Sequence, residues 1–408
     1  MTIADPTPPA TTAGGHSPVR GWLAVLAVTL GIFSLMTSEL LPVGLLTPVG
    51  DALDVSEGRA ALMVIVPGLV AAVSAPLVTV ATGRVDRRLV LALLIGLMGA
   101  ANLASAFATG FAVVLAARFL IGVSVGGFWA LAGGIALRLV PPHHVVRATA
   151  VIFGGVEAAS VLGVPAGTLI GDFSGWRTAF AAVGVLGLVA LACMLFLMPP
   201  VPPQRTIGPA DLPRTLRGNA ALRAGLAMTS LLITGHFTAY TFLRPILQGD
   251  GVDGDLIGVL LLVFGVAGLC GNFIAGALVE RRLRQTALGI SVTLTIVMIA
   301  VAVNDNTVLS GGILLVVWGL GYGAVPVTVQ TWILKAAPDA PEAASSLNVS
   351  AFNLSIAAGA LLGGIAVDTF STGSALWIGA ALTVLTVFAV GAVRRNTGAS
   401  PDTRNIPG

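Results

Sequence analysis

The sequence carries little charge. Only 10% of its 408 residues are Asp, Glu, Lys or Arg, whereas soluble domains carry about 25%. Hydrophobic residues make up 56% of the chain, and the mean hydropathy is +0.97. So few polar side chains cannot cover a water-facing surface. The composition therefore excludes a soluble domain and predicts an integral membrane protein.

The sequence also lacks the residues of most catalytic and metal sites. Cys193 and Cys270 each lie within an apolar run, which excludes a disulfide framework and a CxxC site. Neither GxxxxGK[ST] nor HExxH occurs, and His143 and His144 have no metal-ligand partners at useful spacing. Gly122–Gly126 fits GxSxG, but it lies inside an apolar run and not at a strand-to-helix turn. We expect no enzyme activity, no metal and no cofactor.

Twelve apolar runs occupy most of the chain, each long enough for a membrane-spanning helix. They are Trp22–Val49, Ala60–Thr82, Leu89–Phe107, Ala112–Leu139, Val145–Ile170, Thr178–Met198, Ala221–Leu247, Leu256–Val279, Thr286–Val303, Leu309–Leu334, Ala344–Val367 and Ala375–Val393. We predict an all-α membrane protein with six helices at 21–198 and six at 221–395. A polar linker at 199–220 joins them, and disordered tails lie at 1–20 and 396–408.

The basic residues predict the orientation. With the first span beginning in the cytoplasm, nearly all Arg and Lys fall in inner loops, and only Arg59 and Arg177 fall in outer loops. This predicts an inner-membrane protein with both termini in the cytoplasm. The sequence pI of about 9.4 then reflects topology, so we expect no nucleic-acid partner.

The two halves repeat at a spacing of about 196 residues. Gly163 and Gly167 correspond to Gly359 and Gly363, and each pair belongs to a stripe of small residues at every fourth position. Such stripes predict close helix packing. Two repeated bundles with the same orientation in the membrane are typical of transporters whose substrate site lies between the halves.

Several segments carry a family resemblance. Thr82–Arg88 (TGRVDRR) resembles the signature loop of the major facilitator superfamily, and Arg118–Gly122 resembles its RxxxG motif. Gly163–Gly167 (GVPAG, with Pro165) resembles the span-five motif of antiporters. The chain thus resembles the twelve-span drug:proton antiporter family. Ser38–Pro48 resembles its purine nucleoside exporters, and Gly235–Tyr240 its sugar exporters.

The resemblance implies proton-coupled efflux of a small solute by alternating access, with the proton gradient as energy source. The solute is expected among purine nucleosides and their analogues, sugars or drugs. We expect the solute, protons and the bilayer as partners, and a monomer. One alternative is an uptake symporter of the same fold, against which the span-five motif stands. Another is a sensor or scaffold, which should carry a soluble output domain.

Two carboxylates within the spans are candidates for proton coupling. Glu39 and Arg118 are expected at similar depth in spans one and four, so we predict an ion pair in which Glu39 carries the proton. A static pair that fixes two helices is the alternative. Glu157 in span five points away from the small-residue stripe, toward the bundle interior or the cavity. Glu157 could serve a proton or substrate role, or it could be a structural acid held by local hydrogen bonds, and the sequence favours neither.

Residues on spans four, seven and ten are candidates for a central pocket that takes a flat or amphipathic solute. Interfacial aromatics and packing contacts are the alternative for the aromatic and small residues. For His236, which could titrate near neutral pH, the alternative is a hydrogen-bonded structural role, and that alternative is favoured. The candidates are Trp129, His236, Tyr240, Arg244, Trp318, Tyr322 and Gln330.

The charged loop between spans two and three is a candidate conformational latch. It holds Arg84, Asp86, Arg87 and Arg88. Such a cluster can pair with a helix end or an acidic partner in only one of two rocked states. We predict that Asp86 acts as the latch between the halves.

Overall fold

The computed structural model describes residues 18–60, 62–203, 207–249, 251–252, 254–304 and 307–392. These residues form helices and turns, with no β-strand among them. The first helix begins at Pro18, so it includes residues that the sequence had assigned to the tail. The rest of that tail and the C-terminal tail at 396–408 lie outside the described residues.

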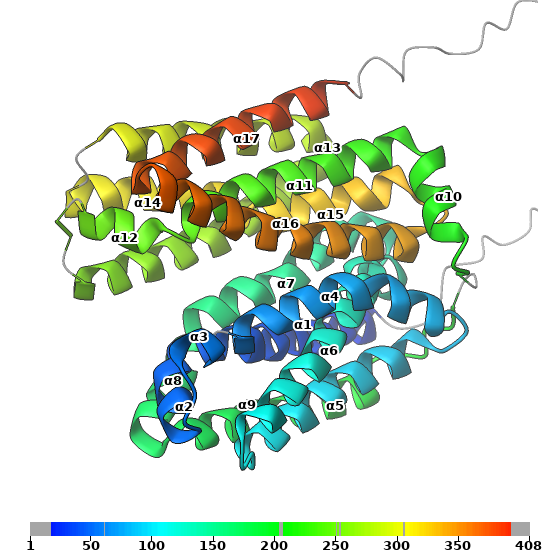
Figure 1. Cartoon of the computed structure of the whole chain (residues 1–408). Coiled ribbons are helices and arrows are strands. Elements are labelled where there is room, and N and C mark those ends of the chain that lie inside the picture. Colours follow the sequence, from blue (N-terminus) through cyan, green and yellow to red (C-terminus); the bar gives the residue numbers. More distant parts are fainter. Residues whose placement is uncertain are drawn as a thin grey trace, which may run out of the picture.

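The first half of the chain forms an N-terminal bundle, drawn from blue to green in Figure 1. Asp86 caps α5, because its Oδ1 accepts a hydrogen bond from Arg88 N at 2.8 Å. The elements of the bundle are α1 (Pro18–Leu40), the 3-10 turn η1 (Leu41–Gly44), α2 (Leu46–Ala52), α3 (Glu57–Ala60), α4 (Leu62–Ala81), α5 (Arg87–Ala106), α6 (Phe111–Leu139), the 3-10 turn η2 (Pro142–His144), α7 (Val145–Ala158), the π-helical turn η3 (Ala159–Gly163), α8 (Val164–Ser174) and α9 (Trp176–Leu197).

The second half forms a C-terminal bundle, drawn from green to red in Figure 1. Asn219 caps α11 through a 2.9 Å bond from Leu222 N, and Thr307 and Ser310 form a capping box at α14. The elements are α11 (Ala220–Tyr240), α12 (Leu243–Gly249), α13 (Gly254–Val303), α14 (Val308–Gly323), α15 (Val325–Ala336), α16 (Pro341–Thr369) and α17 (Thr372–Ala392). The short helix α10 (Asp211–Gly218) lies in the linker.

The described helices account for twelve membrane crossings. Ten are long and apolar enough to cross a membrane, and the bent pair α11 and α12 forms an eleventh. Helix α13 counts once among these, yet its 50 residues would extend about 75 Å, against a hydrocarbon core of about 30 Å. Its backbone is non-helical at Arg282, which divides it into two crossings. Together with the comparisons below, this confirms the predicted fold class.

Two prolines leave carbonyl groups that other helices satisfy. A helical carbonyl normally accepts from the amide four residues ahead, and proline has no N–H. Pro42 therefore leaves the carbonyl of Ser38 free, and Pro76 leaves that of Ala72 free. Arg118 Nη1 donates to Ser38 O at 2.8 Å. Ser350 Oγ donates to Ala72 O at 2.5 Å, so one of these bonds crosses between the bundles.

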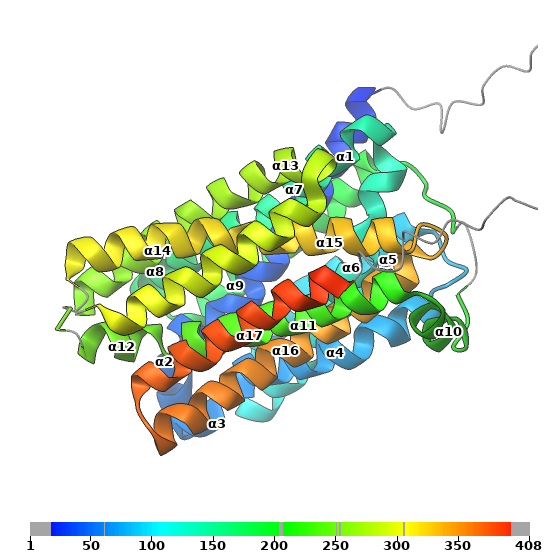
Figure 2. The same cartoon turned by 90° about the horizontal axis from the view of Figure 1, so that it is seen from above.

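The bundles meet where α16 and α13 of the C-terminal bundle pack against helices of the N-terminal bundle. Helix α16 packs along α4 and α6, and α13 packs along α7; Figure 2 shows α16 beside α4. Under the internal repeat, spans two and eleven correspond to spans eight and five. The contact between α16 and α4 is therefore equivalent to the contact between α13 and α7, and a pseudo-two-fold axis relates them. Asn272 Nδ2 on α13 donates to Ala150 O on α7 at 2.8 Å, as Ser350 on α16 does to α4.

The small-residue stripes pack as pseudo-equivalent pairs. A Cβ at Gly163 would lie 2.2 Å from Thr37 Oγ1, and one at Gly167 would lie 2.3 Å from Leu41 Cδ1, both in the first span. The stripes thus bring span five onto span one and, in the same way, span eleven onto span seven. For the second stripe, a Cβ at Gly359 would lie 2.6 Å from Thr234 O and one at Gly363 2.4 Å from Thr238 O. The side chain of Pro165 is not among those described.

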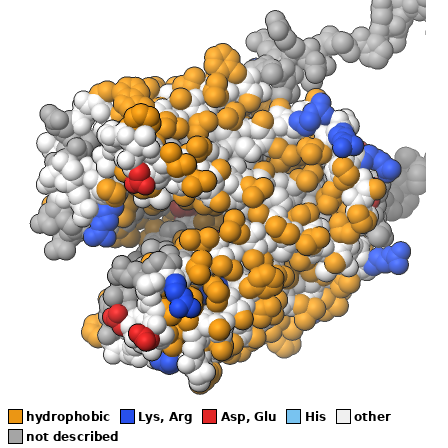
Figure 3. Space-filling view, viewed as in Figure 1, with side chains coloured by type: hydrophobic (Ala, Val, Ile, Leu, Met, Phe, Trp, Pro, Cys, Tyr) orange, Lys and Arg blue, Asp and Glu red, His pale blue; other side chains and the backbone are white. Residues whose placement is uncertain are grey.

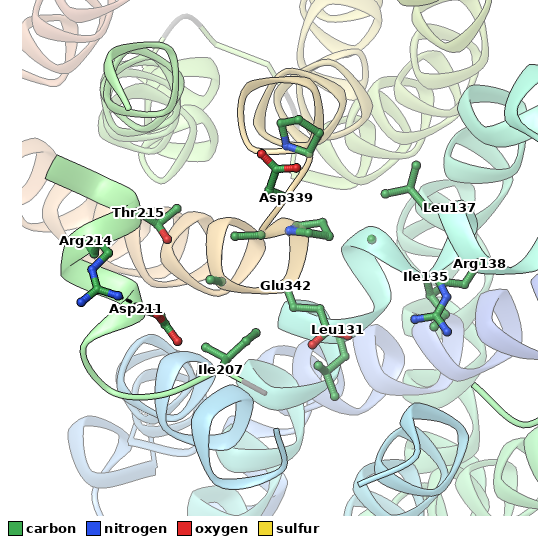
Figure 4. A pocket seen from close by; sticks show the side chains of 15 residues that line it. Leu131, Ile135, Leu137, Arg138, Ile207, Asp211, Arg214, Thr215, Asp339 and Glu342 are labelled. Carbon is green, nitrogen blue, oxygen red and sulfur yellow. Dashed lines mark ion pairs between the residues drawn. The ribbon is translucent and has the colours of Figure 1, made fainter. Parts of the chain in front are cut away.

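The two ends of the molecule differ. At the open end, which carries α2, α3 and α12, Figure 3 shows a hollow between the bundles. At the linker end, defined by α10 and by the loops before α5 and α16, the bundles are in contact. A cavity of about 320 Å³ lies at the linker end beneath α10, and it is lined by Arg138, Asp211, Asp339 and Glu342 among others. Figure 4 shows that α6, the linker and the start of α16 all contribute to its walls.

Candidate transport site

Arg118 lies at the centre of a polar cluster inside the N-terminal bundle. Its side chain is fully buried, and its guanidinium lies 4.9 Å from the ring centre of Phe180 on α9. Nη1 donates to Ser38 O, and Nη2 donates to Asn102 Oδ1 at 3.2 Å. Asn102 in turn donates to Ser38 Oγ at 2.7 Å. The cluster ties α6 to α1 and α5 next to the position where Pro42 ends the first helix.

Glu39 adjoins this cluster without a direct partner in it. No ion pair within 4.0 Å joins Glu39 to Arg118, although the guanidinium charge acts on the carboxylate. Glu39 Oε2 is buried and has no hydrogen bond among the described residues. Arg118 therefore does not form the predicted direct ion pair with Glu39. It is bonded instead to the carbonyl of Ser38, the residue before Glu39. The signal for that arrangement was Pro42, and Asn102 was not predicted at all.

Glu157 lies on α7 at the contact between the bundles. Its side chain is 8% exposed, and a Cβ at Gly268 on α13 would lie 2.9 Å from Glu157 Oε2. The carboxylate therefore projects across the interface toward α13, as the sequence had placed it away from the small-residue stripe. Its charge acts on the hydroxyl groups of Tyr240 and Tyr322.

An aromatic cluster fills the facing part of the C-terminal bundle. His236 stacks on Tyr322, with ring centres 3.6 Å apart and planes 9° apart, and on Tyr240 at 4.9 Å and 20°. Trp318 Nε1 donates to His236 Nδ1 at 3.1 Å. Phe264 on α13, which the sequence did not single out, lies 5.0 Å from Tyr240. Four of the predicted pocket residues therefore come together from α11 and α14.

The other three predicted pocket residues lie apart from this cluster. Trp129 packs on Phe153 at 5.2 Å within the N-terminal bundle. Gln330 donates to Ser345 Oγ at 2.8 Å. Arg244 is an exposed residue of α12. Gln330 also contacts α6, because a Cβ at Gly133 would lie 2.7 Å from its Nε2. It therefore belongs to the contact between the bundles.

The charged loop reaches the other bundle through Arg87. This side chain is 1% exposed, and its Nη2 lies 2.5 Å from Glu342 Oε2 at the start of α16, while Nε donates to Oε1 at 2.7 Å. Asp86 does not cross: its carboxylate accepts from Arg88 N and from Val201 N. The ion pair between the bundles is thus made by the neighbour of the residue we predicted.

The remaining residues of that loop serve the N-terminal bundle. Arg88 Nη2 donates to Leu195 O on α9, and Arg84 is exposed. Arg87 also donates to the carbonyls of Thr82 and Val85 at 2.6 and 3.0 Å. Glu342 was missed because it is 255 residues distant in the chain. Its place in the first turn of a helix is the only signal the sequence offered.

Two pseudo-symmetric helical bundles with buried charge between and within them define a membrane transporter of the major facilitator type. A family model described as Major Facilitator Superfamily matches residues 27–347. The chain belongs to this family and is a multi-pass membrane transporter, not an enzyme. This confirms the resemblance seen in the motifs of spans two to five.

Named relatives and solved structures agree with that family. The "Purine ribonucleoside efflux pump NepI" proteins of Salmonella paratyphi B and Salmonella typhimurium are each 33% identical over 379 residues, covering 92% of this chain and 95% of theirs. The human organic anion transporter MFSD10 (TETRAN) has a TM-score of 0.77 at 18% identity and covers 92% of this chain and 100% of its own. The proton:xylose symporter XylE has a TM-score of 0.74 at 15% identity and covers 92% and 96%. At these identities the two structures show the fold alone.

Proposed function

We propose that this chain exports a purine ribonucleoside or a close analogue across the cytoplasmic membrane in exchange for protons. Both termini lie in the cytoplasm in this proposal, so the linker end faces inward and the open end faces outward. The hollow in Figure 3 is then the route by which solute leaves. Protons entering from outside reset the carrier.

In this proposal, Glu39 is the residue that couples transport to protons. A carboxylate within a membrane helix is costly to keep ionised unless it has a partner or takes a proton. Glu39 Oε2 is buried and has no hydrogen bond among the described residues, and the nearby cation Arg118 is bonded to Ser38 O and Asn102. The carboxylate is therefore poised between a charged and a protonated form. Alternation between these forms allows loaded movement in one direction and protonated movement in the other.

The substrate class rests on two observations. The NepI proteins, which share 33% of their residues with this chain over nearly their full length, are named for purine ribonucleoside efflux. The interface between the bundles also presents the stacked rings of Tyr240, His236 and Tyr322. Aromatic platforms of this kind stack well on nucleobases, each of which has a flat π face.

The latch proposal now centres on Arg87. The pair with Glu342 holds the linker end closed while the open end is hollowed. In an alternating cycle the same pair has to break when the linker end opens. Arg87 and Glu342 therefore favour the outward-facing arrangement, and Asp86 keeps the loop folded for that contact.

The test is uphill transport of a labelled purine ribonucleoside by the full-length protein in proteoliposomes with an imposed pH gradient. Glu39→Gln keeps the shape of the side chain but cannot alternate between charged and neutral forms. We expect gradient-driven accumulation to fall to the level of protein-free liposomes. Exchange of nucleoside without a gradient should continue, because the cavity keeps its shape.

A matched control uses another acid on a helix. Glu280 is exposed near the break in α13 at Arg282, and Glu280→Gln should retain uphill transport. If Glu39→Gln still concentrates nucleoside with an undiminished proton flux, Glu39 is structural and the proposed coupling residue is wrong. If the parent protein moves none of the purine nucleosides, the proposed substrate class is wrong.

A further inference from the structure

The Glu157 carboxylate of the N-terminal bundle lies against closely packed glycines of the C-terminal bundle. Glu157 on α7 is 8% exposed, and its Oε2 would lie 2.9 Å from a Cβ at Gly268. Gly323 packs on the same place, since a Cβ there would lie 2.0 Å from Gly268 O. Gly323 directly follows Tyr322 in the chain. The carboxylate is thereby held beside the segment that carries Tyr322.

Glu157 has no partner within the part of the chain that the structure describes. Among the described residues it has no hydrogen bond and no ion pair. A buried ionised acid without a partner is expensive, so such a group normally binds a proton, an ion, water or a ligand. The π-helical turn Ala159–Gly163 follows two residues later, and such turns are frequent at functional sites. Both observations indicate that Glu157 binds something the protein itself does not supply.

The rings beside Glu157 form a parallel set. Tyr240, His236, Phe264 and Tyr322 lie within 30° of parallel in every pair that makes contact. Both tyrosines are half-buried and the other two rings are buried. His236 Nε2 is buried without a hydrogen bond among the described residues. A flat face and two unpaired polar atoms therefore occur in one cluster.

These features define the kind of ligand that fits. The rings favour a planar heteroaromatic group, and an ionised carboxylate accepts hydrogen bonds but donates none. We propose that Glu157 binds the N–H edge of a purine base stacked on the tyrosine rings, and so selects guanine and hypoxanthine over adenine. This inference rests on the proposed function and assigns its specificity to one residue.

The preference follows from the edges of the three bases. Guanine presents two adjacent donors, the N1–H and the 2-amino group, which match the two oxygens of a carboxylate. Hypoxanthine presents the N1–H alone. Adenine presents an acceptor at N1, whose lone pair faces the carboxylate and repels it. A good bidentate contact discriminates well between a matched and a mismatched base, so we expect guanosine to bind roughly tenfold or more tightly than adenosine, with inosine between them.

The experiment measures binding of guanosine, inosine, adenosine and 1-methylguanosine to the full-length protein in detergent or nanodiscs. Methylation at N1 removes the central donor, so 1-methylguanosine should lose most of the advantage of guanosine. Glu157→Gln replaces one acceptor by a donor, and an amide matches adenine. We expect this variant to bind adenosine at least as tightly as guanosine, and to be insensitive to N1 methylation.

Three further variants separate recognition from folding. Glu157→Asp keeps the carboxylate and should keep the order of the bases. Tyr322→Leu should weaken all four nucleosides together, by about tenfold for the loss of one stacking contact, without changing their order. Glu39→Gln removes the carboxylate of span one and should also leave the order unchanged. Each variant is first checked for a monodisperse elution profile.

The outcomes distinguish this inference from the proposed function. If the parent binds the nucleosides but shows no base preference, or if Glu157→Gln keeps the parent's order, Glu157 does not recognise the base and the inference is wrong. If the parent binds none of them, the proposed substrate class fails and the inference fails with it. Binding of a quaternary ammonium compound in their place would mean that Glu157 recognises a cation.

Discussion

The two bundles share a backbone plan but hold different chemistry. In the N-terminal bundle, the interior carries a guanidinium, an amide and a carboxylate at Arg118, Asn102 and Glu39. The corresponding part of the C-terminal bundle carries stacked rings around His236 and Tyr322. One bundle therefore holds charge and the other holds a flat surface. Glu157 of the first bundle projects toward this surface of the second.

Spans four and ten show how the repeat produced this difference. At the spacing of about 196 residues, Gly122 and Gly126 correspond to Trp318 and Tyr322. A Cβ at Gly126 would lie 2.4 Å from Ala71 O, so α6 and α4 are in direct backbone contact. In the other bundle the close contact with α13 is made one position later, at Gly323. That one-residue shift turns large rings toward the interface while it keeps two helices tightly packed.

The largest expected effect tests whether the two stripes are equivalent. Leucine at Gly163 would meet the side chain of Thr37, which can move, whereas leucine at Gly359 would meet the carbonyl of Thr234, which cannot. Overpacking costs about 1–3 kcal/mol and sometimes more. We expect Gly359→Leu to abolish transport and folded yield, and Gly163→Leu to reduce both severely, as judged by size-exclusion profile and nucleoside exchange.

Gly258→Leu is the control for these substitutions. Gly258 lies in α13 with nothing within 4 Å of an added Cβ, so the variant should behave like the parent. Normal activity of both Gly163→Leu and Gly167→Leu would show that the first stripe does not pack against span one.

A smaller effect concerns the ion pair that joins the bundles. Arg87→Ala removes hydrogen bonds to a charged partner, each worth about 1.5–3 kcal/mol. It should therefore increase the population with the linker end open by tenfold or more. Spin-label distances across the linker end measure that shift. Asp86→Asn, which perturbs contacts within one bundle, should shift the population less and slow turnover modestly.

The double variant Arg87→Ala with Glu342→Gln sharpens this test. Residues in direct contact give non-additive effects, so the double variant should open the linker end little more than Arg87→Ala alone. Additive shifts would show that the two side chains act independently, and that the pair is not the latch.

The smallest effect compares two hydrogen bonds from a side chain of the C-terminal bundle to a backbone carbonyl of the N-terminal bundle. Ser350→Ala leaves Ala72 O without a donor, and one hydrogen bond is worth about 1 kcal/mol, or roughly a fivefold shift toward the open linker end. Asn272→Ala should shift the same distances by a similar amount through Ala150. A shift toward the closed linker end in either variant would show that the bond it removes does not hold the linker end closed.

Local sequence patterns predicted the membrane crossings, the helix faces that pack closely and the aromatic cluster. Apolar length and flanking charge gave the twelve crossings, including the break at Arg282, because a membrane fixes the length of a helix. The spacing of four residues between Gly163 and Gly167, and between Gly359 and Gly363, predicted helix faces that do pack closely. The cluster of His236, Tyr240, Trp318 and Tyr322 came together because each lies on an interior face of its helix.

Contacts between distant segments were not predictable in the same way. Arg118 was expected to pair with Glu39, yet it is bonded to the carbonyl one residue earlier, since Pro42 left that acceptor free. Arg87 was one residue from the position chosen for the latch, and its partner Glu342 comes from the far half of the chain. Hydrophobic periodicity says which face of a helix is buried. It does not say which atom in a neighbouring helix lacks a partner.

Pro76 gives the conformational cycle a requirement for water. When the linker end closes, Ser350 supplies the hydrogen that proline cannot give to the carbonyl of Ala72. When the linker end opens in the proposed cycle, that oxygen has no protein donor, and an unsatisfied carbonyl in an apolar setting is costly. A water molecule has to enter between α4 and α16 as they separate. Solutes that withdraw water from the protein should therefore favour the outward-facing form, whatever the transported molecule is.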